Sequence, residues 1–442
     1  MREKCGVFGI LSNDTSQECL PMVVQGLTLL QHRGQESCGI AYEQSNNLIL
    51  KKGLGLVKNT LSNCGNINTN KCIGHVRYST SGSSKINEFD KHNECQPLYG
   101  VCHLGSFYLV HNGNIPNVGK HDTQYVIDFI QQCKAETWQE VLSELLESIP
   151  CAYCLLIITI NEIFALRDRF GIRPLCIGRN HQSYCVSSES CALLHHTLLR
   201  DVRPGEIICI DSKGLNTIYQ SNESVYSLCA LEYIYFLRPT SICDGKSVHD
   251  VRNELGIALS NNEDLILEDH HIVIGIPDTG IISAKGYARE LNIVYKQAIT
   301  KNHNVQRTFI APTETERRTL CDKKFMFIEE EIKGKNVILV DDTIVRGNVM
   351  KHIISRCWMI GANEIHIRIP APPVINICQL GIDIPSREEL LAFNKTLDEI
   401  KSELNVTSIK YLTCEELGMV IPTTCYKECF GEALNPKMFN AT

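Results

Sequence analysis

The chain has 442 residues, 43% hydrophobic and 21% charged, with a formal net charge of −7. A length beyond ~250–300 residues predicts at least two domains, and the composition is typical of a soluble globular protein. The negative charge argues against a nucleic-acid-binding surface, and the longest uncharged apolar run, residues 151–160, is shorter than the ~20 residues of a membrane span. We expect a cytoplasmic protein without nucleic-acid or membrane partners.

The 22 cysteines are scattered along the chain, so disulfides are not expected and most thiols should be reduced and buried. Cys5 follows the leader Met-Arg-Glu-Lys, which is too short and polar for a secretion signal. Two interpretations stay open for Cys5. It falls near the terminus by chance, or residues 1–4 are a propeptide whose removal leaves the Cys5 thiol and its own α-amine as a nucleophile and a base.

The first half of the chain, residues 1–225, consists largely of short β-type runs separated by turns. The predicted strands are 5–10, 72–80, 107–115, 154–160 and 162–168, and the helical patterns cover 20–34 and 123–149. These patterns predict an α+β domain dominated by sheet.

From about residue 232, helical patterns alternate with fully apolar strands. The predicted strands are 270–278, 336–342 and 364–370, and the helices between them are 282–291 and 345–362. Such alternation predicts a parallel sheet in an α/β domain. The polar stretch 219–229 indicates the join, so we expect domains over 5–228 and 229–442.

The segment "VILVDDTIVRGN" (337–348) carries the strongest chemical signal. Two acids end a strand, where parallel sheets bind ligands, and the loop amides before the next helix suit a phosphate. Carboxylates beside a phosphate suit ribose hydroxyls. The alternative is that the two acids only cap the helix.

"VILVDDTIVRG" resembles the phosphoribosyl pyrophosphate (PRPP) signature of type I phosphoribosyltransferases. Together with "CGVFGI", "LQHRGQES", "GHVRYSTSG", "HNGNI" and "EYIYFLRP", it makes the chain similar, from Cys5 to about residue 415, to the amidophosphoribosyltransferase family. The resemblance implies an α+β N-terminal-nucleophile (Ntn) glutaminase domain followed by an α/β type I phosphoribosyltransferase domain with a parallel sheet.

The reaction that the resemblance implies consumes glutamine, PRPP and water and yields 5-phosphoribosylamine, pyrophosphate and glutamate, the first step of purine synthesis. Two alternatives remain: a glutaminase that passes ammonia to a different phosphorylated acceptor, and a non-catalytic PRPP-sensing homologue. The resemblance also implies purine nucleotides as feedback inhibitors and a homo-oligomer, either dimer or tetramer.

For glutamine hydrolysis, the resemblance implies that Cys5 is the nucleophile. Arg77 should pair with the α-carboxylate of glutamine and Asp122 with its α-ammonium group. Asn112 and Gly113 should supply the donors of an oxyanion hole.

For PRPP, the resemblance implies that Asp341 and Asp342 bind the ribose hydroxyls, directly or through Mg²⁺, with Thr279 also near the metal. The residues expected at the phosphates are Thr343, Val345, Arg346, Gly347 and Asn348 for the 5′-phosphate and Lys301, Arg307 and Lys324 for the pyrophosphate. The chain departs from the family pattern at His303-Asn304, Asp322 and Asn348-Val349.

Many family members carry a 4Fe–4S cluster, and the resemblance implies Cys229, Cys378, Cys425 and Cys429 as its ligands. The last two are spaced one residue wider than the usual C-x-x-C. The alternative is that these four thiols pack as small hydrophobic side chains.

Overall fold

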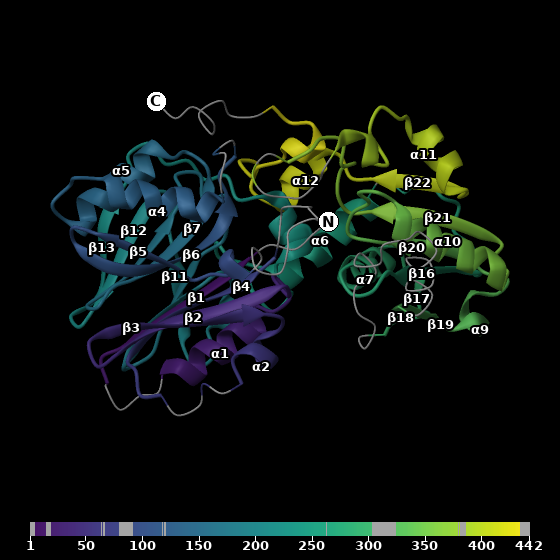
Figure 1. Cartoon of the computed structure of the whole chain (residues 1–442). Helices are drawn as coiled ribbons and strands as arrows, with labels where there is room; N and C mark the ends of the chain where they lie inside the picture. The colour runs from purple at the N-terminus through teal and green to yellow at the C-terminus, as the bar shows by residue number, and fades with distance from the viewer. Residues whose placement is uncertain are drawn as a thin grey trace.

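The computed structural model describes residues 5–14, 19–62, 64, 67–78, 92–116, 118, 121–261, 263–302, 324–378, 380 and 386–433. Figure 1 shows the N-terminal half, in purple and blue, beside the C-terminal half, in green, with α6 (Val248–Ser260) and the yellow α12 (Cys414–Val420) between them. None of the described helices is both long and apolar enough to cross a membrane.

The N-terminal half contains two antiparallel sheets. The seven-stranded sheet has the order β11-β9-β10-β1-β4-β2-β3. Its strands are β1 (Gly6–Ser12), β2 (Ser37–Gln44), β3 (Asn47–Leu54), β4 (Lys71–Arg77), β9 (Cys176–Arg179), β10 (Ser183–Ser187) and β11 (Thr197–Asp201). The six-stranded sheet has the order β13-β12-β8-β7-β6-β5. Its strands are β5 (Leu98–Cys102), β6 (Gly105–Asn114), β7 (Ala152–Ile158), β8 (Ile163–Arg167), β12 (Glu206–Asp211) and β13 (Gly214–Gln220).

The two sheets pack face to face, and helices cover their outer faces. Val7 and Ile73 of one sheet meet Val110 and Leu156 of the other in a buried layer. Helices α1 (Cys19–Leu29) and α2 (Val57–Thr60) cover the seven-stranded sheet, whereas α4 (Asp122–Gln132) and α5 (Trp138–Ser148) cover the six-stranded one. The central strands β1, β4 and β7 are buried along their whole length, because one face of each sheet packs on the other sheet and the opposite face is covered by helices. The α+β fold expected for this half is confirmed.

The five strands predicted in this half are present, but the helical pattern over 123–149 is not one segment. It divides into α4 and α5, with residues 133–137 between them. Thr137 starts α5 through a capping box: its hydroxyl accepts from the Glu140 amide, and the Glu140 carboxylate accepts from the Thr137 amide. Such a cap fixes a helix start and so separates the two helices.

The C-terminal half is built on a five-stranded parallel sheet with the order β17-β16-β20-β21-β22. Its strands are β16 (His271–Gly275), β17 (Val294–Tyr295), β20 (Asn336–Val340), β21 (Glu364–Ile369) and β22 (Ser408–Tyr411). Its other longer helices are α7 (Gly280–Glu290), α10 (Asn348–Ile360) and α11 (Leu397–Leu404). The predicted parallel α/β domain is confirmed.

Short elements complete this half. They are a π-turn η2 (Glu232–Phe236), β14 (Ile242–Cys243), β15 (Lys246–Ser247), β18 (Ile299–Lys301), β19 (Phe325–Phe327) and α9 (Glu329–Ile332). The C-terminal segment returns to the junction of the halves, where Cys229 and Tyr426 form a parallel bridge and the Cys229 amide donates to Ile172 O. The core of the C-terminal half therefore continues into the N-terminal half through Phe170 and Ile172.

Candidate active sites

Cys5 lies directly before β1, the central strand of the seven-stranded sheet, and its side chain is partly buried. Its Sγ lies 3.7 Å from Tyr78 O, and its carbonyl oxygen accepts from Arg33 Nε at 3.1 Å. Burial raises the pKa of the Cys5 thiol, and the nearby Arg77 charge offsets this only in part. Because the thiolate is the nucleophile, Cys5 needs a base to become reactive.

Arg77 ends β4, which pairs with β1 and so places the guanidinium beside Cys5. The Arg77 side chain is buried and contacts the carboxylates of Glu36, at 3.5 Å, and Glu94. A guanidinium fork suits a carboxylate ligand. Glu94 already occupies the Arg77 guanidinium in this structure.

Asp122 begins α4 and is surrounded by histidines. Its Oδ2 lies 3.5 Å from His111 Nδ1, its Oδ1 accepts from the Thr123 amide at 2.8 Å, and His121 lies alongside. Burial alone would raise the pKa of Asp122, but the His111 and His121 rings hold it well below the usual range. Asp122 is thus a carboxylate that stays charged although it is partly buried.

Asn112 ends the buried part of β6, and Gly113, the next residue, is partly buried. Asn112 Nδ2 lies 3.4 Å from Ser188 Oγ, and the Ser188 hydroxyl in turn accepts from the Val7 amide at 2.9 Å. A Cβ at Gly113 would lie 2.1 Å from Ala152 O, so only glycine fits there. The Ser188 contacts bring Asn112 to the start of β1, and Gly113 is its neighbour on β6.

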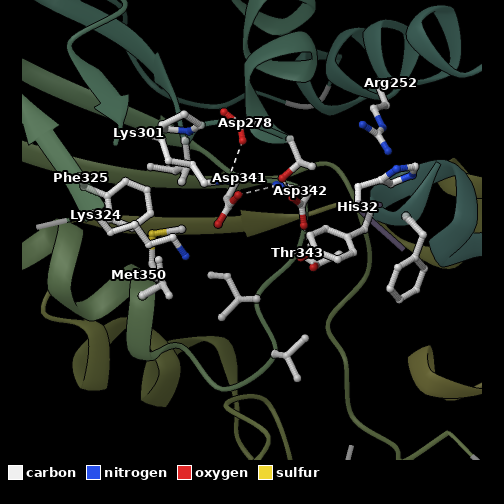
Figure 2. A pocket seen from close by; sticks show the side chains of 18 of the residues that line it. His32, Arg252, Asp278, Lys301, Lys324, Phe325, Asp341, Asp342, Thr343 and Met350 are labelled. Atoms are coloured by element: carbon white, nitrogen blue, oxygen red, sulfur yellow. Dashed lines mark hydrogen bonds and ion pairs between the residues drawn. The ribbon is translucent and has the colours of Figure 1, made fainter. Parts of the chain in front are cut away.

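A second site is a pocket of about 400 Å³ at the carboxyl ends of the parallel strands. Figure 2 shows Asp341 and Asp342 at its centre, with Lys301 and Lys324 on one side and Arg252 and His32 on the other. Every predicted PRPP or Mg²⁺ residue except Arg307 lines this pocket: Thr279, Lys301, Lys324, Asp341, Asp342, Thr343, Val345, Arg346, Gly347 and Asn348. Arg307, like His303, Asn304 and Asp322, lies outside the described residues.

Asp341 and Asp342 follow β20 directly. Burial and the proximity of the two carboxyls raise the pKa of Asp341, and burial raises that of Asp342 despite hydroxyl donors. Those donors are Thr279, and Thr343 at 2.8 Å from Asp342 Oδ1. A paired carboxylate with raised pKa values favours a cation or hydroxyl donors as its ligand.

The loop after Asp342 leads into α10 through Gly347, which has a left-handed backbone with φ 76°. This conformation favours glycine and turns the first amides of α10 toward the pocket, where a helix N-terminus suits an anion. On the opposite side, Lys301 Nζ lies 2.6 Å from Asp278 Oδ2. Positive and negative groups therefore share one cavity, as a phosphorylated ligand with a metal requires.

The structure also adds four pocket residues to which the sequence assigned no role. Tyr235 and Arg238 belong to "EYIYFLRP", and His32 to "LQHRGQES". Those motifs identified the family without indicating which side chain faces a ligand. Arg252 comes from α6, where it donates to Tyr233 O and Leu237 O, and no sequence pattern indicated it.

A buried network of charges connects the two sites. Arg33, which donates to Cys5 O, binds Glu189 Oε1 at 2.7 Å and both carboxylate oxygens of Glu232 at 3.1 Å. Glu189 also contacts His32 Nε2 at 2.7 Å and accepts from the Arg238 amide at 2.8 Å. Since His32 and Arg238 line the pocket, an unbroken chain of polar contacts runs from Cys5 to the second site.

The four predicted cluster cysteines come from segments that meet at the junction. Cys229 bridges to Tyr426, and the amides of Ile375 and Asn376 donate to Cys429 O, which brings the Cys378 segment close. The thiol of Cys229 lies close enough to those of Cys425 and Cys429 to raise their pKa values, and the thiol of Cys378 does the same to Cys229 and Cys429. Burial raises the pKa of Cys229 and of Cys425 to about 12. Every described cysteine, these four included, has a free thiol.

Comparison with known proteins agrees with both halves. Residues 83–195 match the glutamine amidotransferase domain family. The chain is 36% identical to amidophosphoribosyltransferase of Pyrococcus horikoshii over 93% of this chain and 92% of the relative. It is 34% identical to the enzyme of Bacillus subtilis over 94% and 89%. A solved structure of the B. subtilis glutamine PRPP amidotransferase, complexed with ADP and GMP, superimposes with a TM-score of 0.86 and 33% identity over 97% of this chain and 96% of that one.

The fold and these similarities define a glutamine amidotransferase joined to a phosphoribosyltransferase domain. The chain belongs to the amidophosphoribosyltransferase family, whose relatives it matches over nearly their whole length. The family, the enzyme class and the two-domain fold class expected from the sequence are thereby confirmed.

Proposed function

We propose that the enzyme transfers ammonia from glutamine to PRPP through the residues described above, forming 5-phosphoribosylamine, pyrophosphate and glutamate. The observation that carries the proposal is the second pocket, in which every described residue expected at PRPP lines one cavity. A glutamine site around Cys5 in the same chain supplies the nitrogen.

In the first half-reaction, Cys5 Sγ attacks the carboxamide carbon of glutamine. Arg77 and Asp122 hold the α-carboxylate and the α-ammonium group, and Asn112 with the Gly113 amide stabilises the tetrahedral oxyanion. The C–N bond breaks, ammonia leaves with the proton taken from the thiol, and a γ-glutamyl thioester remains. Water then cleaves the thioester to glutamate and regenerates the thiol.

Removal of residues 1–4 would provide the base for this step. The α-amine of Cys5 would then have a reference pKa of ~7.7–8.0, suited to proton transfer near neutral pH. This base would offset the raised pKa of the buried thiol. We place the glutaminase domain at 5–228 and the phosphoribosyltransferase domain at 229–442.

In the second half-reaction, ammonia attacks the anomeric carbon of PRPP and pyrophosphate leaves. Asp341 and Asp342 accept hydrogen bonds from the ribose hydroxyls, and the Thr343–Asn348 loop binds the 5′-phosphate. Lys301, Lys324 and Arg307 neutralise the pyrophosphate. The oxygen donors Thr279, Asp341 and Asp342 fit Mg²⁺, which would neutralise charge on the leaving group.

Cys229, Cys378, Cys425 and Cys429 would hold a structural 4Fe–4S cluster. Four convergent thiols fit such a cluster, and iron would keep deprotonated sulfurs whose pKa values burial otherwise raises. Anaerobically purified protein should absorb near ~400 nm and contain about four irons per chain. Cys429→Ser should lose the iron, whereas Cys19→Ser, a buried thiol elsewhere, should not; iron-free, fully active protein would contradict the cluster.

Purine nucleotides and self-association are further parts of the proposal. The B. subtilis relative was solved in complex with ADP and GMP, which supports nucleotide binding by this enzyme, and we propose that such binding inhibits it. We propose a homo-dimer or homo-tetramer, which sedimentation of the purified chain with and without GMP would test. A cytoplasmic location remains a prediction.

The decisive experiment measures glutamate release with and without PRPP, together with formation of pyrophosphate. The proposed function predicts PRPP-stimulated glutamate release with stoichiometric pyrophosphate. Glutamate release at the same rate with and without PRPP would indicate another acceptor for the ammonia. Absence of both products would indicate a non-catalytic homologue.

A further inference from the structure

A cluster of metal-binding side chains lies away from both active sites, in the C-terminal half. Single ligand atoms of His271, Glu364 and His366 all lie within 4.8 Å of one another. His271 opens β16 and Glu364 opens β21, so the cluster is at the amino ends of the parallel strands. The PRPP pocket lies at their carboxyl ends, and the cluster therefore has no part in the chemistry proposed above.

The register of the sheet creates this cluster. His271 pairs with Asn336 and Asn336 with Glu364, so the three residues form one row across β16, β20 and β21. His366 is two residues beyond Glu364 and therefore points to the same face of the sheet. These strands lie side by side in Figure 1. The side chains are placed by backbone pairing rather than by a loop, and a site on such elements is rigid.

Each imidazole has a hydrogen-bond partner that can orient it as a ligand. His366 Nδ1 lies 2.9 Å from Ser408 Oγ, on the neighbouring strand β22. His271 Nδ1 lies 3.3 Å from Glu268 O and 3.0 Å from the Glu268 amide. Metal-binding histidines use such contacts at the second nitrogen to fix the tautomer. His366 can thus carry hydrogen on Nδ1 and leave Nε2 for a metal. In His271 the Glu268 amide donates to Nδ1, so metal binding at Nε2 requires that Nδ1 carries the hydrogen and donates it to Glu268 O instead.

The third ligand provides charge and access. Glu364 Oε2 lies 3.1 Å from His366 Nε2, and the Glu364 side chain is 44% exposed, whereas that of His366 is 2% exposed. The exposed carboxylate gives an ion a route to two buried rings. Asn336, whose amide lies 3.4 Å from His271 Nε2, could present its oxygen after a half-turn of the amide.

The surrounding charges do not oppose a cation. Arg368, which donates to Ser408 Oγ at 3.0 Å, is neutralised by Glu263 through two contacts of 2.6 and 2.8 Å. His270, stacked on His271, pairs with the Glu268 carboxylate. Among the described residues, Glu364 pairs with no lysine or arginine and so adds negative charge beside the two rings.

We propose that His271, Glu364 and His366 form a binding site for a divalent transition-metal ion, with Zn²⁺ the best match. Two imidazoles and one carboxylate are ligands that Zn²⁺ prefers over Mg²⁺ or Ca²⁺. Water or Asn336 completes the coordination. The ion joins the amino ends of β16 and β21 and is structural, because the PRPP pocket lies at the other end of the sheet.

The first test locates the ion directly. Crystals of the full-length holoenzyme soaked in ZnCl₂ are measured at wavelengths on both sides of the zinc absorption edge. The expected result is an anomalous peak at ~2.0–2.2 Å from nitrogen atoms of His271 and His366 and from a Glu364 oxygen. Zinc found only at cysteines, or no peak at this cluster, would overturn the proposal.

The second test uses Co²⁺ binding in solution, followed by absorption. Cobalt held by imidazole and carboxylate gives ligand-field bands without the sulfur-to-metal charge-transfer band of a cysteine site. Glu364→Gln should weaken binding of this species, and Ser408→Ala should weaken it by about tenfold or more. His249→Asn, which alters an exposed histidine on α6, serves as the control and should bind as wild type does.

Glu364→Gln and Ser408→Ala should each retain kcat within about twofold, since neither residue touches a substrate site. Zn²⁺ should raise the melting temperature of the wild type and of His249→Asn but not that of Glu364→Gln. Equal Co²⁺ affinity in wild type and Glu364→Gln would overturn the site.

Discussion

The two proposed sites use the same side chain, a partly or wholly buried aspartate, in opposite ways. Asp122, in the glutamine site, lies between His111 and His121, and their rings hold its pKa well below the usual range. Asp341 and Asp342, in the PRPP pocket, lie against each other, and burial raises the pKa of both. The residue type is constant, so the neighbours decide the charge.

This difference in charge indicates which kind of ligand each site is suited to bind. Asp122 is already stabilised as a carboxylate, so the glutamine site can accept an ammonium group without rearranging its own charges. Ionisation of both carboxyls of the Asp341–Asp342 pair is unfavourable until a cation or hydroxyl donors bind to them. In the free protein the Asp122 carboxylate is therefore ready for an ammonium group, whereas the Asp341–Asp342 pair still needs a cation or hydroxyl donors.

Cys5→Ala should have the largest effect and should separate the two sites. Synthesis from glutamine should fall by at least ~10⁴-fold, because the nucleophile is gone. Synthesis from added ammonia should persist, since it needs only the PRPP pocket. Phosphoribosylamine formation with each nitrogen donor is the measurement, and loss of both activities would show that the sites are not independent.

The double variant Asp341→Asn, Asp342→Asn should break the second site alone. Turnover of PRPP should fall by about 10²–10³-fold with either nitrogen donor. A low basal glutaminase activity should remain, because the Cys5 site keeps all its residues. Continued formation of phosphoribosylamine would place the ribose site elsewhere.

Glu232→Gln tests the buried link between the sites. Removal of one charge leaves Arg33 and Arg173 short of a partner in a buried network, which costs about 3–5 kcal/mol. Urea unfolding measures this loss, and PRPP stimulation of glutaminase should also decrease. Glu223→Gln, which alters an exposed carboxylate paired with Arg169, is the control and should change stability by less than ~1 kcal/mol.

The pH dependence of stability should have opposite signs for the two kinds of aspartate. Asp341 has a raised pKa, so the folded state binds its proton more tightly and stability falls as the pH rises above 3.8, the ordinary value. Asp341→Asn should therefore stabilise the metal-free protein at pH 7, by about 1 kcal/mol or more, and the gain should vanish below about pH 4.

Asp122→Asn should do the reverse. The pKa of Asp122 is depressed, so its contribution is present above the unfolded value of 3.8 and is lost as the pH falls toward the folded value. This variant should be less stable than wild type at pH 7, with the deficit shrinking at acidic pH. Chemical denaturation of both variants in EDTA between about pH 2 and pH 8 gives the measurement, and a pH dependence of the same sign for both variants would contradict the distinction.

Glu94→Gln should have the smallest effect and sharpens the description of the glutamine site. Glu94 occupies the Arg77 guanidinium, so its carboxylate competes with that of the substrate. Loss of this charge should lower KM for glutamine by a few fold, with kcat unchanged, because the partly exposed pair is worth roughly 1 kcal/mol. Steady-state kinetics decides, and a raised KM would mean that Glu94 orients Arg77 instead.

Sequence patterns predicted the fold class, the family and the position of eight of the described strands, namely β1, β4, β6, β7, β8, β16, β20 and β21. Apolar strands such as 336–342 and motifs such as "VILVDD" are local signals, and they remain readable without a structure. The break between α4 and α5 was missed because the helical periodicity continued across a capping box at Thr137. Roles assigned to individual site residues remain predictions.

Other features depend on contacts between distant segments and left no local pattern. Arg33, Glu189 and Glu232 come from three separate regions, and Arg252 reaches the pocket from the side of a helix. The His271–Glu364–His366 cluster exists only because the strands pair in one register. Long-range pairing is the information that single-sequence periodicity lacks.

The bridge between Cys229 and Tyr426 also bears on the order in which the chain can fold during synthesis. Roughly two hundred residues separate these partners, and such distant contacts form late. The antiparallel half ends at Gln220, so it can close on the ribosome while the remaining half is still being made. The segment around Cys229 must wait for the last part of the chain. We therefore expect a nascent enzyme whose first domain is folded and whose second domain becomes protected from proteases only when translation is nearly complete.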